Sequence, residues 1–401
     1  MQVIPSTAKP LLRHSPIFPG ESLSSFIARL VVLNGYSSLS ILERLCQSDH
    51  WTRCENFLHL EGLNRLAQLS GAPAEELWTA SDAYLAGEPF PLNDMEMFYP
   101  SLTATVRSTR FAWYCPKCLT EATYHRLIWR PVSSAACLKH TCQLMGGCPK
   151  CHQPVSVYDV VQLHCRHCRT DLRTAKSSTL PGNEYELTAQ MAVQSWLTGG
   201  VAPKLNWPEC PPQTLCRLAD GLALGMIYLS KQKTYPRIPE ISRGCSSRPS
   251  RLQQLSPSQI LFAYALAIQC MVDWPQGFRR FLYWCEPNPK REPGKSLPGL
   301  FTYLAKNLWN NESSVFIWDA FHAFAMDRRY FLWGRAEKQM AYEQLPAYAN
   351  PEEAAQILEV SQDALSLLVE KRSLTPIRLW HGISYRYFFQ RDELRNLSQY
   401  I

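Results

Sequence analysis

Four cysteine-rich pairs between residues 115 and 168 constrain this chain more than any other feature of its sequence. They read CPKC, CLKH, CPKC and CRHC, with the spacing C-x2-C-x18-C-x2-H and then, after seven residues, C-x2-C-x13-C-x2-C. Two intervening residues let both side chains of a pair reach one ion, and a second pair completes a tetrahedron, as in structural zinc sites. The predicted ligands are Cys115, Cys118, Cys137 and His140 for one zinc ion, and Cys148, Cys151, Cys165 and Cys168 for a second.

The spacing leaves the grouping of these pairs open, because the seven-residue link also permits an interleaved arrangement. Disulfides are the alternative use of so many cysteines. The first 30 residues lack the basic and apolar regions of a signal peptide, and C-x-x-C pairs without an export signal favour metal. Protein side chains fill all four positions of each predicted site, which makes both zinc ions structural. Cys142, two residues after His140, is surplus to both sites.

Charge is distributed unevenly along the chain, whose formal net charge is +7. Residues 1–100 hold 6 Lys and Arg against 11 Asp and Glu, whereas residues 101–176 hold 11 against 3. Seven thiolates on two zinc ions would lower the charge of the second segment from +8 to about +5. A basic region of this size suits nucleic acid or an acidic protein surface. A basic surface that is merely solvated is the alternative.

Periodicity and turn residues predict a mainly α, multi-domain chain. The expected domains are an N-terminal helical domain resembling a helix-turn-helix, a central tandem zinc-finger or ribbon module with short β-strands, a helical domain and a C-terminal winged helix-turn-helix. Their predicted bounds are residues 1–100, 101–176, 177–345 and 346–401. Within the zinc module, residues 155–158 are expected to form a strand. Residues 176–182 are expected to be a linker.

The N-terminal domain is predicted to begin with an extended, proline-rich arm at residues 1–20. A helix is then expected to start after Ser22, which can cap it, and to stop at Gly35. Residues 63–79 have the spacing of a helix-turn-helix, with Gly71 in the turn. Because this domain is acidic, a contact with protein is favoured over insertion into a DNA groove.

Helices separated by loops are expected between residues 184 and 340. Four of the candidates lie at 186–200, 214–230, 256–274 and 299–310, and another begins near residue 313. Ser256 is a predicted N-cap, followed by a proline at the first helical position. The glycine spacing needed for a phosphate-binding loop is absent around Lys295.

The C-terminal segment combines helix signals with a basic hairpin. Asn350 is a predicted helix cap, and Glu359 stands where a helix-turn-helix usually has glycine. Alternating residues around 381–382 predict a β-hairpin wing, and residues 391–397 a closing helix. No acidic residue lies between 371 and 391, which favours phosphate contacts over the alternative of protein docking. The predicted nucleic-acid contacts are Lys371, Arg372, Arg378, Arg386 and Arg391.

Several of these stretches together resemble the TniQ/TnsD family of transposon target-selection proteins. They are GESLSSFIARL, LAQLSGAPAEEL, and the run CPKCLTEATYHRLIWR, CLKHTCQLMGGCPKC and CRHC. The resemblance extends over about residues 16–175 and transfers the eight zinc ligands. It implies an adaptor that recognises target DNA directly, or binds an RNA-guided CRISPR effector complex. It also implies recruitment of an AAA+ ATPase regulator, which brings the transposase.

The sequence therefore predicts a non-enzymatic DNA-transposition adaptor with no catalytic residues and two structural zinc ions. It is expected to be cytoplasmic and nucleoid-associated in a bacterium, with no membrane contact. The expected partners are the AAA+ ATPase and target DNA or the CRISPR effector with its guide RNA, and a homodimer is left open. The alternative is a zinc-containing, DNA-binding transcription regulator that binds one operator as a dimer.

Overall fold

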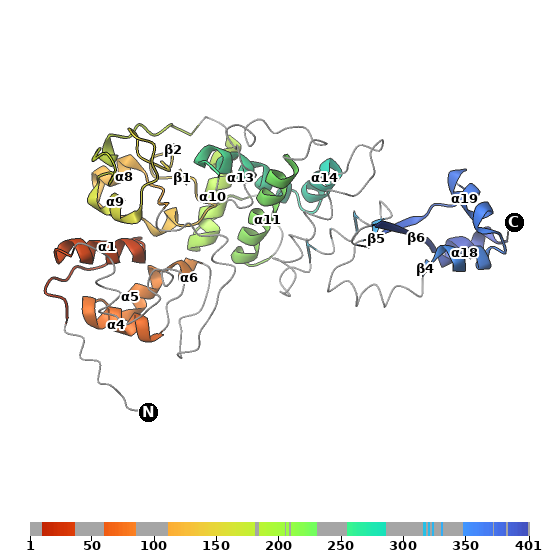
Figure 1. Ribbon diagram of the computed structural model, residues 1–401, viewed down its shortest axis with the longest axis horizontal. Helices are drawn as coiled ribbons and strands as arrows, with labels where there is room; N and C mark the ends of the chain where they lie inside the picture. Colours follow the sequence, from red (N-terminus) through yellow and green to blue (C-terminus); the bar gives the residue numbers. More distant parts are fainter. Residues whose placement is uncertain are drawn as a thin grey trace, which may run out of the picture. The chain divides into compact units, whose positions relative to one another are not determined.

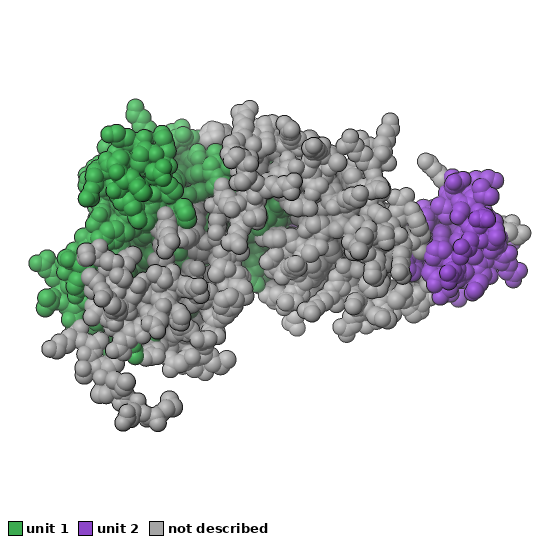
Figure 2. Space-filling view, viewed as in Figure 1, with its two compact units in different colours: residues 1–205, 211–269 green, residues 206–210, 270–401 purple. Residues whose placement is uncertain are grey.

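The computed structural model is mainly helical, with a few short strands (Figure 1). It divides into two compact units, residues 1–205 with 211–269 and residues 206–210 with 270–401 (Figure 2). None of the helices in the described residues is both long and apolar enough to span a membrane. The structure describes residues 10–36, 60–85, 111–180, 184–204, 206–207, 210–230, 255–285, 316–317, 320, 323–324, 330–331, 348–371, 373–381 and 384–399.

The first unit begins with helix α1 (Leu23–Leu33), whose ends match the prediction. Ser22 caps its N-terminus by accepting a hydrogen bond from the Ser25 N–H at 3.3 Å. The chain leaves the helix at Gly35, which has a φ of +69°. Residues other than glycine rarely adopt this left-handed conformation, so a glycine suits the stop.

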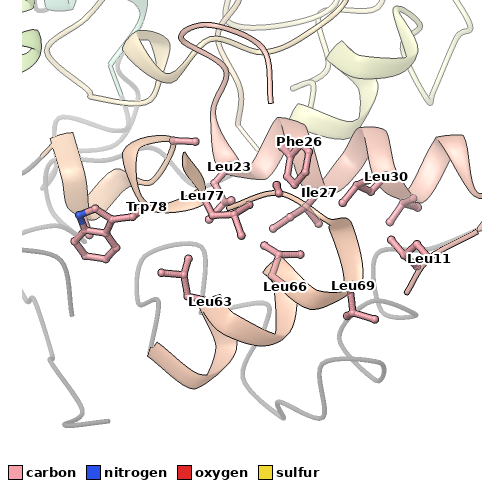
Figure 3. Close-up of a cluster of buried hydrophobic side chains, with 14 residues drawn as sticks. Leu11, Leu23, Phe26, Ile27, Leu30, Leu63, Leu66, Leu69, Leu77 and Trp78 are labelled. Carbon is pink, nitrogen blue, oxygen red and sulfur yellow. The ribbon is translucent and has the colours of Figure 1, made fainter. Parts of the chain in front are cut away.

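Helices α4 (Leu60–Ser70), α5 (Ala74–Thr79) and α6 (Asp82–Leu85) follow. The turn between α4 and α5 contains Gly71 at a φ of +74°, as the helix-turn-helix spacing predicts. Leucines of α1 and α4 face one another in a fully apolar core (Figure 3). Leu11, inside the predicted extended arm, is 4% exposed and joins this core, so that part of the arm is packed.

The cysteine-rich segment folds into short elements joined by turns. These are α8 (Pro116–Glu121), the 3-10 helix η1 (Leu127–Trp129), strands β1 (Ala136–Cys137) and β2 (Cys142–Gln143), α9 (Val157–Gln162) and the 3-10 helix η2 (Leu172–Thr174). Strands β1 and β2 pair antiparallel, with Cys137 opposite Cys142.

The expectation of a strand at residues 155–158 was wrong, because helix α9 begins at Val157. Ser156 and Asp159 form a reciprocal capping box, in which each side chain bonds the backbone N–H of the other residue. Such a box satisfies two N–H groups at a helix start and favours the helix over a strand. The segment after the module is also more ordered than a linker, since Gln143 N–H donates to Ser178 O at 3.0 Å.

Three longer helices follow: α10 (Glu184–Thr198), α11 (Pro212–Ser230) and α13 (Pro257–Met271). The first unit ends within α13, at residue 269. All three helices were predicted. Ser256 caps α13, since its Oγ accepts from the Gln259 N–H at 3.3 Å. The stretch SLSILERL (residues 38–45), which the sequence also predicts to be a short helix, lies outside the described residues. The same is true of the helix predicted at 299–310 and of most of the one predicted from 313.

The second unit contains α14 (Gln276–Cys285), which was not predicted, and a C-terminal region of mixed structure. Its sheet has the order β3-β5-β6-β4, with β3 parallel to β5 and the other pairs antiparallel. The C-terminal elements are β3 (Tyr330–Phe331), β4 (Tyr348–Ala349), α18 (Pro351–Ile357), α19 (Gln362–Glu370), β5 (Ile377–His381), β6 (Ser384–Gln390) and α20 (Arg391–Leu397).

The C-terminal helices pack around a small core that includes Leu358, Leu365 and Leu394. Asn350 caps α18 through a capping box with Glu353, as the sequence predicts for the start of this helix. The closing helix α20 has the predicted bounds. The order of two helices, two strands and a helix therefore agrees with the predicted order of elements.

Candidate metal centres

The first ligand cluster consists of Cys115, Cys118, Cys137 and His140, whose ligand atoms all lie within 4.8 Å of one another. His140 Nδ1 is 3.4, 3.2 and 3.5 Å from the sulfurs of Cys115, Cys118 and Cys137. Four ligands about 2.3 Å from one zinc ion in a tetrahedron would lie about 3.8 Å apart. The donor set and its spacing therefore fit a four-coordinate metal such as zinc.

A carboxylate holds the outer side of His140. Its Nε2 lies 3.0 Å from Glu121 Oε1, and Lys139 donates to the other oxygen of Glu121 at 2.6 Å. The Lys139 and His140 contacts lower the pKa of Glu121. A carboxylate on the second ring nitrogen fixes the tautomer, so that the first nitrogen presents its lone pair to a metal.

The second cluster consists of Cys148, Cys151, Cys165 and Cys168, again within 4.8 Å of one another. Cys148 and Cys168 have their sulfurs 3.4 Å apart, and Cys151 and Cys165 are 3.6 Å apart. The ligand pairs are therefore grouped in sequence order, and the interleaved alternative is not what the fold adopts. Both clusters are compatible with a structural metal ion.

Hydrogen bonds favour the thiolate form of Cys168 in the second cluster. Thr170 Oγ1 lies 3.2 Å from the sulfur of Cys168. Hydrogen bonds from the Thr170 hydroxyl and backbone lower the pKa of Cys168 to about 6. The backbone N–H of Lys150 also donates to Cys148 Sγ, at 3.4 Å. Because the thiolate is the form that binds a metal, these donors favour binding.

Three of the four ligand pairs are followed at once by a residue in the left-handed conformation. Thr141, His152 and Arg169 have φ values of 46°, 58° and 59°. The N–H groups of His152 and Arg169 each return to the carbonyl of the first cysteine of the pair, at 3.1 and 2.8 Å. These tight turns bring both sulfurs of a pair to the same side, at a backbone cost of about 1 kcal/mol per turn.

The link between the clusters is tied to the residue before the first ligand. Tyr114 and Met145 exchange two backbone hydrogen bonds, and the Tyr114 hydroxyl donates to Gly147 O at 3.1 Å. Burial and the nearby Cys148 and Cys165 sulfurs raise the pKa of Tyr114 well above its usual range, so the hydroxyl stays a donor. This bracing holds the seven-residue link in one path.

Residues outside the cysteine-rich segment support the first cluster. The buried Gln190 of α10 accepts from the N–H of Ala135 at 2.9 Å and donates to Ser133 O at 3.0 Å. Gln194, one turn later, donates to Ala136 O at 2.8 Å. These glutamines fix the strand that carries Cys137. No sequence pattern pointed to them beyond their spacing on one face of a helix.

A buried ion pair joins the acidic N-terminal helices to the cysteine-rich segment. Asp82 of α6 accepts from Arg130 Nε at 3.0 and 3.2 Å, and the two side chains are 4% and 2% exposed. Nearby, the Ser22 hydroxyl lies 3.1 Å from Nδ1 of the buried His125. Tyr158 of α9 also packs against the N-terminal core. The N-terminal helices and the first cluster are therefore parts of one folded structure.

Several exposed basic residues lie within the segment of the second cluster or just after it. These residues, which we call the basic rim, are Lys150, Arg166, Arg169, Arg173 and Lys176. Arg166 and Arg173 are each paired with a nearby aspartate, at 2.9 and 2.7 Å. Lys150 and Arg169 form no ion pair with any residue that the structure describes. Their charges are available to a partner.

The five predicted nucleic-acid contacts do not form one group. Lys371 is exposed at the end of α19, whereas Arg391 starts α20 and pairs with Glu353 at 2.6 Å. Arg372 lies outside the described residues. Arg391 is therefore already engaged with a carboxylate.

The other two predicted contacts, Arg378 and Arg386, occupy β5 and β6. In the register of the hairpin Arg378 is opposite Tyr387, and Arg386 is opposite Leu379. Successive positions in a strand alternate between the two faces. The two arginine positions therefore lie on the two arms of the hairpin, as the sequence predicts, and fall on its opposite faces.

The fold and its clusters thus define a mainly helical protein built around two cysteine-rich centres of the metal-binding type. The TniQ family model matches residues 12–144. This match confirms the resemblance to the TniQ family, and these residues form a TniQ domain that associates the chain with transposition target selection. The match includes the N-terminal helices and the first cluster, and ends before the second cluster. No curated protein matches the chain.

Proposed function

We propose that both clusters bind zinc and that the ions are structural. The proposal is supported by four possible ligands in each cluster, by separations near those of a zinc tetrahedron, and by the backbone N–H that donates to the sulfur of Cys148. In the first site, Cys115, Cys118, Cys137 and His140 would hold the ion, with Glu121 orienting the histidine. Bound zinc would supply folding energy to a segment made of short elements.

We further propose that the chain is a non-enzymatic, target-selecting adaptor of DNA transposition. It would connect a target, either a DNA site or an RNA-guided effector complex, to an AAA+ ATPase regulator and the transposase. The single observation that carries this proposal is the TniQ domain match over residues 12–144. The charge distribution supports a division of labour, because one end of the first unit is acidic and the cysteine-rich part is basic.

The acidic N-terminal helices are the proposed contact for the ATPase. Their negative charge disfavours phosphate and suits a basic protein surface. The basic rim of the second cluster is the proposed contact for nucleic acid, since Lys150 and Arg169 are exposed and not engaged by described acids. The C-terminal region is proposed to be a winged helix-turn-helix that adds phosphate contacts through Lys371 and its hairpin.

A zinc-containing transcription regulator is the second candidate. The C-terminal order of helices and hairpin is also typical of operator-binding proteins, and a dimer would then be expected. The two candidates differ in what they bind besides DNA. An adaptor requires an ATPase partner, whereas a regulator requires one specific operator and no ATPase.

The nucleic-acid part of the proposal is tested by a charge substitution in the full-length chain. We expect Lys150→Ala with Arg169→Ala to weaken DNA binding and to flatten its salt dependence by about two charges. The matched control is Lys204→Ala with Arg280→Ala, which removes two exposed charges elsewhere. Fluorescence anisotropy with a DNA duplex at several salt concentrations measures the affinity of each variant and the slope of that affinity with salt.

The comparison of the two double variants decides whether the basic rim contacts phosphate. Weaker binding by the rim variant alone supports the basic rim as a phosphate contact. Equal weakening by both double variants would show a diffuse charge effect and contradict a defined contact. Unchanged binding by both would move the proposed contact away from the rim.

A further inference from the structure

Cys142 lies beside the first cluster although the cluster is complete without it. Its sulfur is 3.6 Å from Cys115 Sγ, the same separation that the structure gives the cluster sulfurs of Cys118 and Cys137. Cys142 is fully buried. The sequence pattern had left this cysteine without a role.

The strand pairing explains why Cys142 faces the cluster. In the antiparallel pair β1–β2, Cys142 is directly opposite the ligand Cys137. Side chains at directly opposed positions project from the same face of a sheet. The fold thus presents a fifth donor to a site that needs four.

We propose that Cys142 is a reserve ligand of the first site, which takes the fourth position on the ion when His140 leaves it. The inference rests on the proposed metal binding. The site would then exist in two forms, with three sulfurs and one nitrogen or with four sulfurs. The four-sulfur form would favour thiophilic divalent cations, for which thiolate is the preferred ligand.

The exchange balances without an oxidant. The bond from an ion to His140 Nδ1 would break, a bond to Cys142 Sγ would form, and the Cys142 thiol would give up its proton. His140 is the ligand best placed to leave. It is the most exposed of the four ligands of this site, with a side chain 15% exposed.

The test uses Co²⁺ in the full-length protein, because each Co–S bond contributes to a charge-transfer absorption. Wild type is expected to bind two cobalt ions through seven sulfurs. His140→Ala is expected to keep two ions and to gain about one seventh in charge-transfer intensity, since the sulfur count rises to eight. His140→Ala with Cys142→Ala is expected to bind one ion. Cys142→Ala alone, with the histidine in place, is expected to match wild type.

Other results would overturn the inference. His140→Ala binding one ion would mean that Cys142 does not replace the histidine. The same follows if His140→Ala keeps two ions without added charge-transfer intensity, since water then fills the fourth position. If His140→Ala does not fold, His140→Gln provides the same comparison with a longer polar side chain. Wild type that binds no metal would instead overturn the metal centres themselves, and the reserve ligand with them.

Discussion

At the scale of single residues, Glu359 shows how a helix end can be specified without glycine. It has a φ of 55°, and its N–H and that of Val360 return to the carbonyls of Gln356 and Ala355, at 3.2 and 3.0 Å. These two bonds form a Schellman motif, in which glycine is the usual residue. The fold therefore tolerates Glu359 at some cost in backbone energy.

Replacing this residue by glycine should stabilise the C-terminal region. We expect Glu359→Gly to raise the free energy of unfolding by about 0.5–1 kcal/mol, because glycine adopts the left-handed conformation without strain. Glu352→Gly, in the first turn of α18, makes the same change in a right-handed helix and should lower stability by up to about 1 kcal/mol. Denaturant unfolding of the full chain measures both. A loss of stability in Glu359→Gly would contradict the Schellman assignment.

At the scale of elements, the Asp82–Arg130 pair connects α6 to the cysteine-rich segment. Asp82→Asn leaves the Arg130 charge buried without its carboxylate, and such a loss costs about 3–5 kcal/mol. The exposed Asp273–Arg280 pair is the control, and Asp273→Asn should cost about 0–1 kcal/mol. Thermal unfolding compares the two variants. Equal effects would mean that the buried pair does not join these elements.

A half-buried carboxyl on α11, bonded to α13, predicts a pH dependence. Asp220 is bonded by the Tyr264 hydroxyl, and burial raises the pKa of Asp220 from 3.8 to about 7. Between these values the unfolded chain ionises while the folded chain keeps its proton. Stability contributed by this group is therefore present below about pH 4 and is lost as pH rises toward 7.

Asp220→Asn removes that titration. We expect the variant to be more stable than wild type at neutral pH, with a difference that grows by up to about 1.4 kcal/mol per pH unit between about pH 4 and 7. Unfolding free energies measured across this range provide the test. A difference that is constant with pH, or that shrinks as pH rises, would show that Asp220 does not titrate as proposed.

The sequence correctly predicted the elements that are specified by residues close together in the chain. The caps at Ser22 and Asn350 and the ligand spacing depend on neighbouring residues, and α1, α18 and both clusters formed as expected. Helix α9 was mistaken for a strand because its valines outweighed the capping box. The Asp82–Arg130 pair joins residues 48 positions apart, and no periodicity reports such a contact.

At the scale of the whole molecule, the TniQ domain and the second cluster occupy one folded unit. Helix α6 precedes the cysteine-rich segment in the sequence and helix α10 follows it, and both form buried hydrogen bonds with that segment. Removing the N-terminal helices would therefore expose this core, and a truncation cannot separate the proposed roles cleanly. Point variants in the full-length chain are the suitable tool.

The most direct test of the adaptor proposal asks whether the chain brings an ATPase to a target. Biotinylated duplex DNA carrying an insertion site is incubated with the AAA+ regulator of the same transposon, with and without a guide complex. We expect the ATPase to be retained, on the DNA or on the guide complex, only when the full-length chain is present. Equal retention of the ATPase without the chain, or binding of the chain to one operator with no ATPase recruited, would contradict the adaptor proposal.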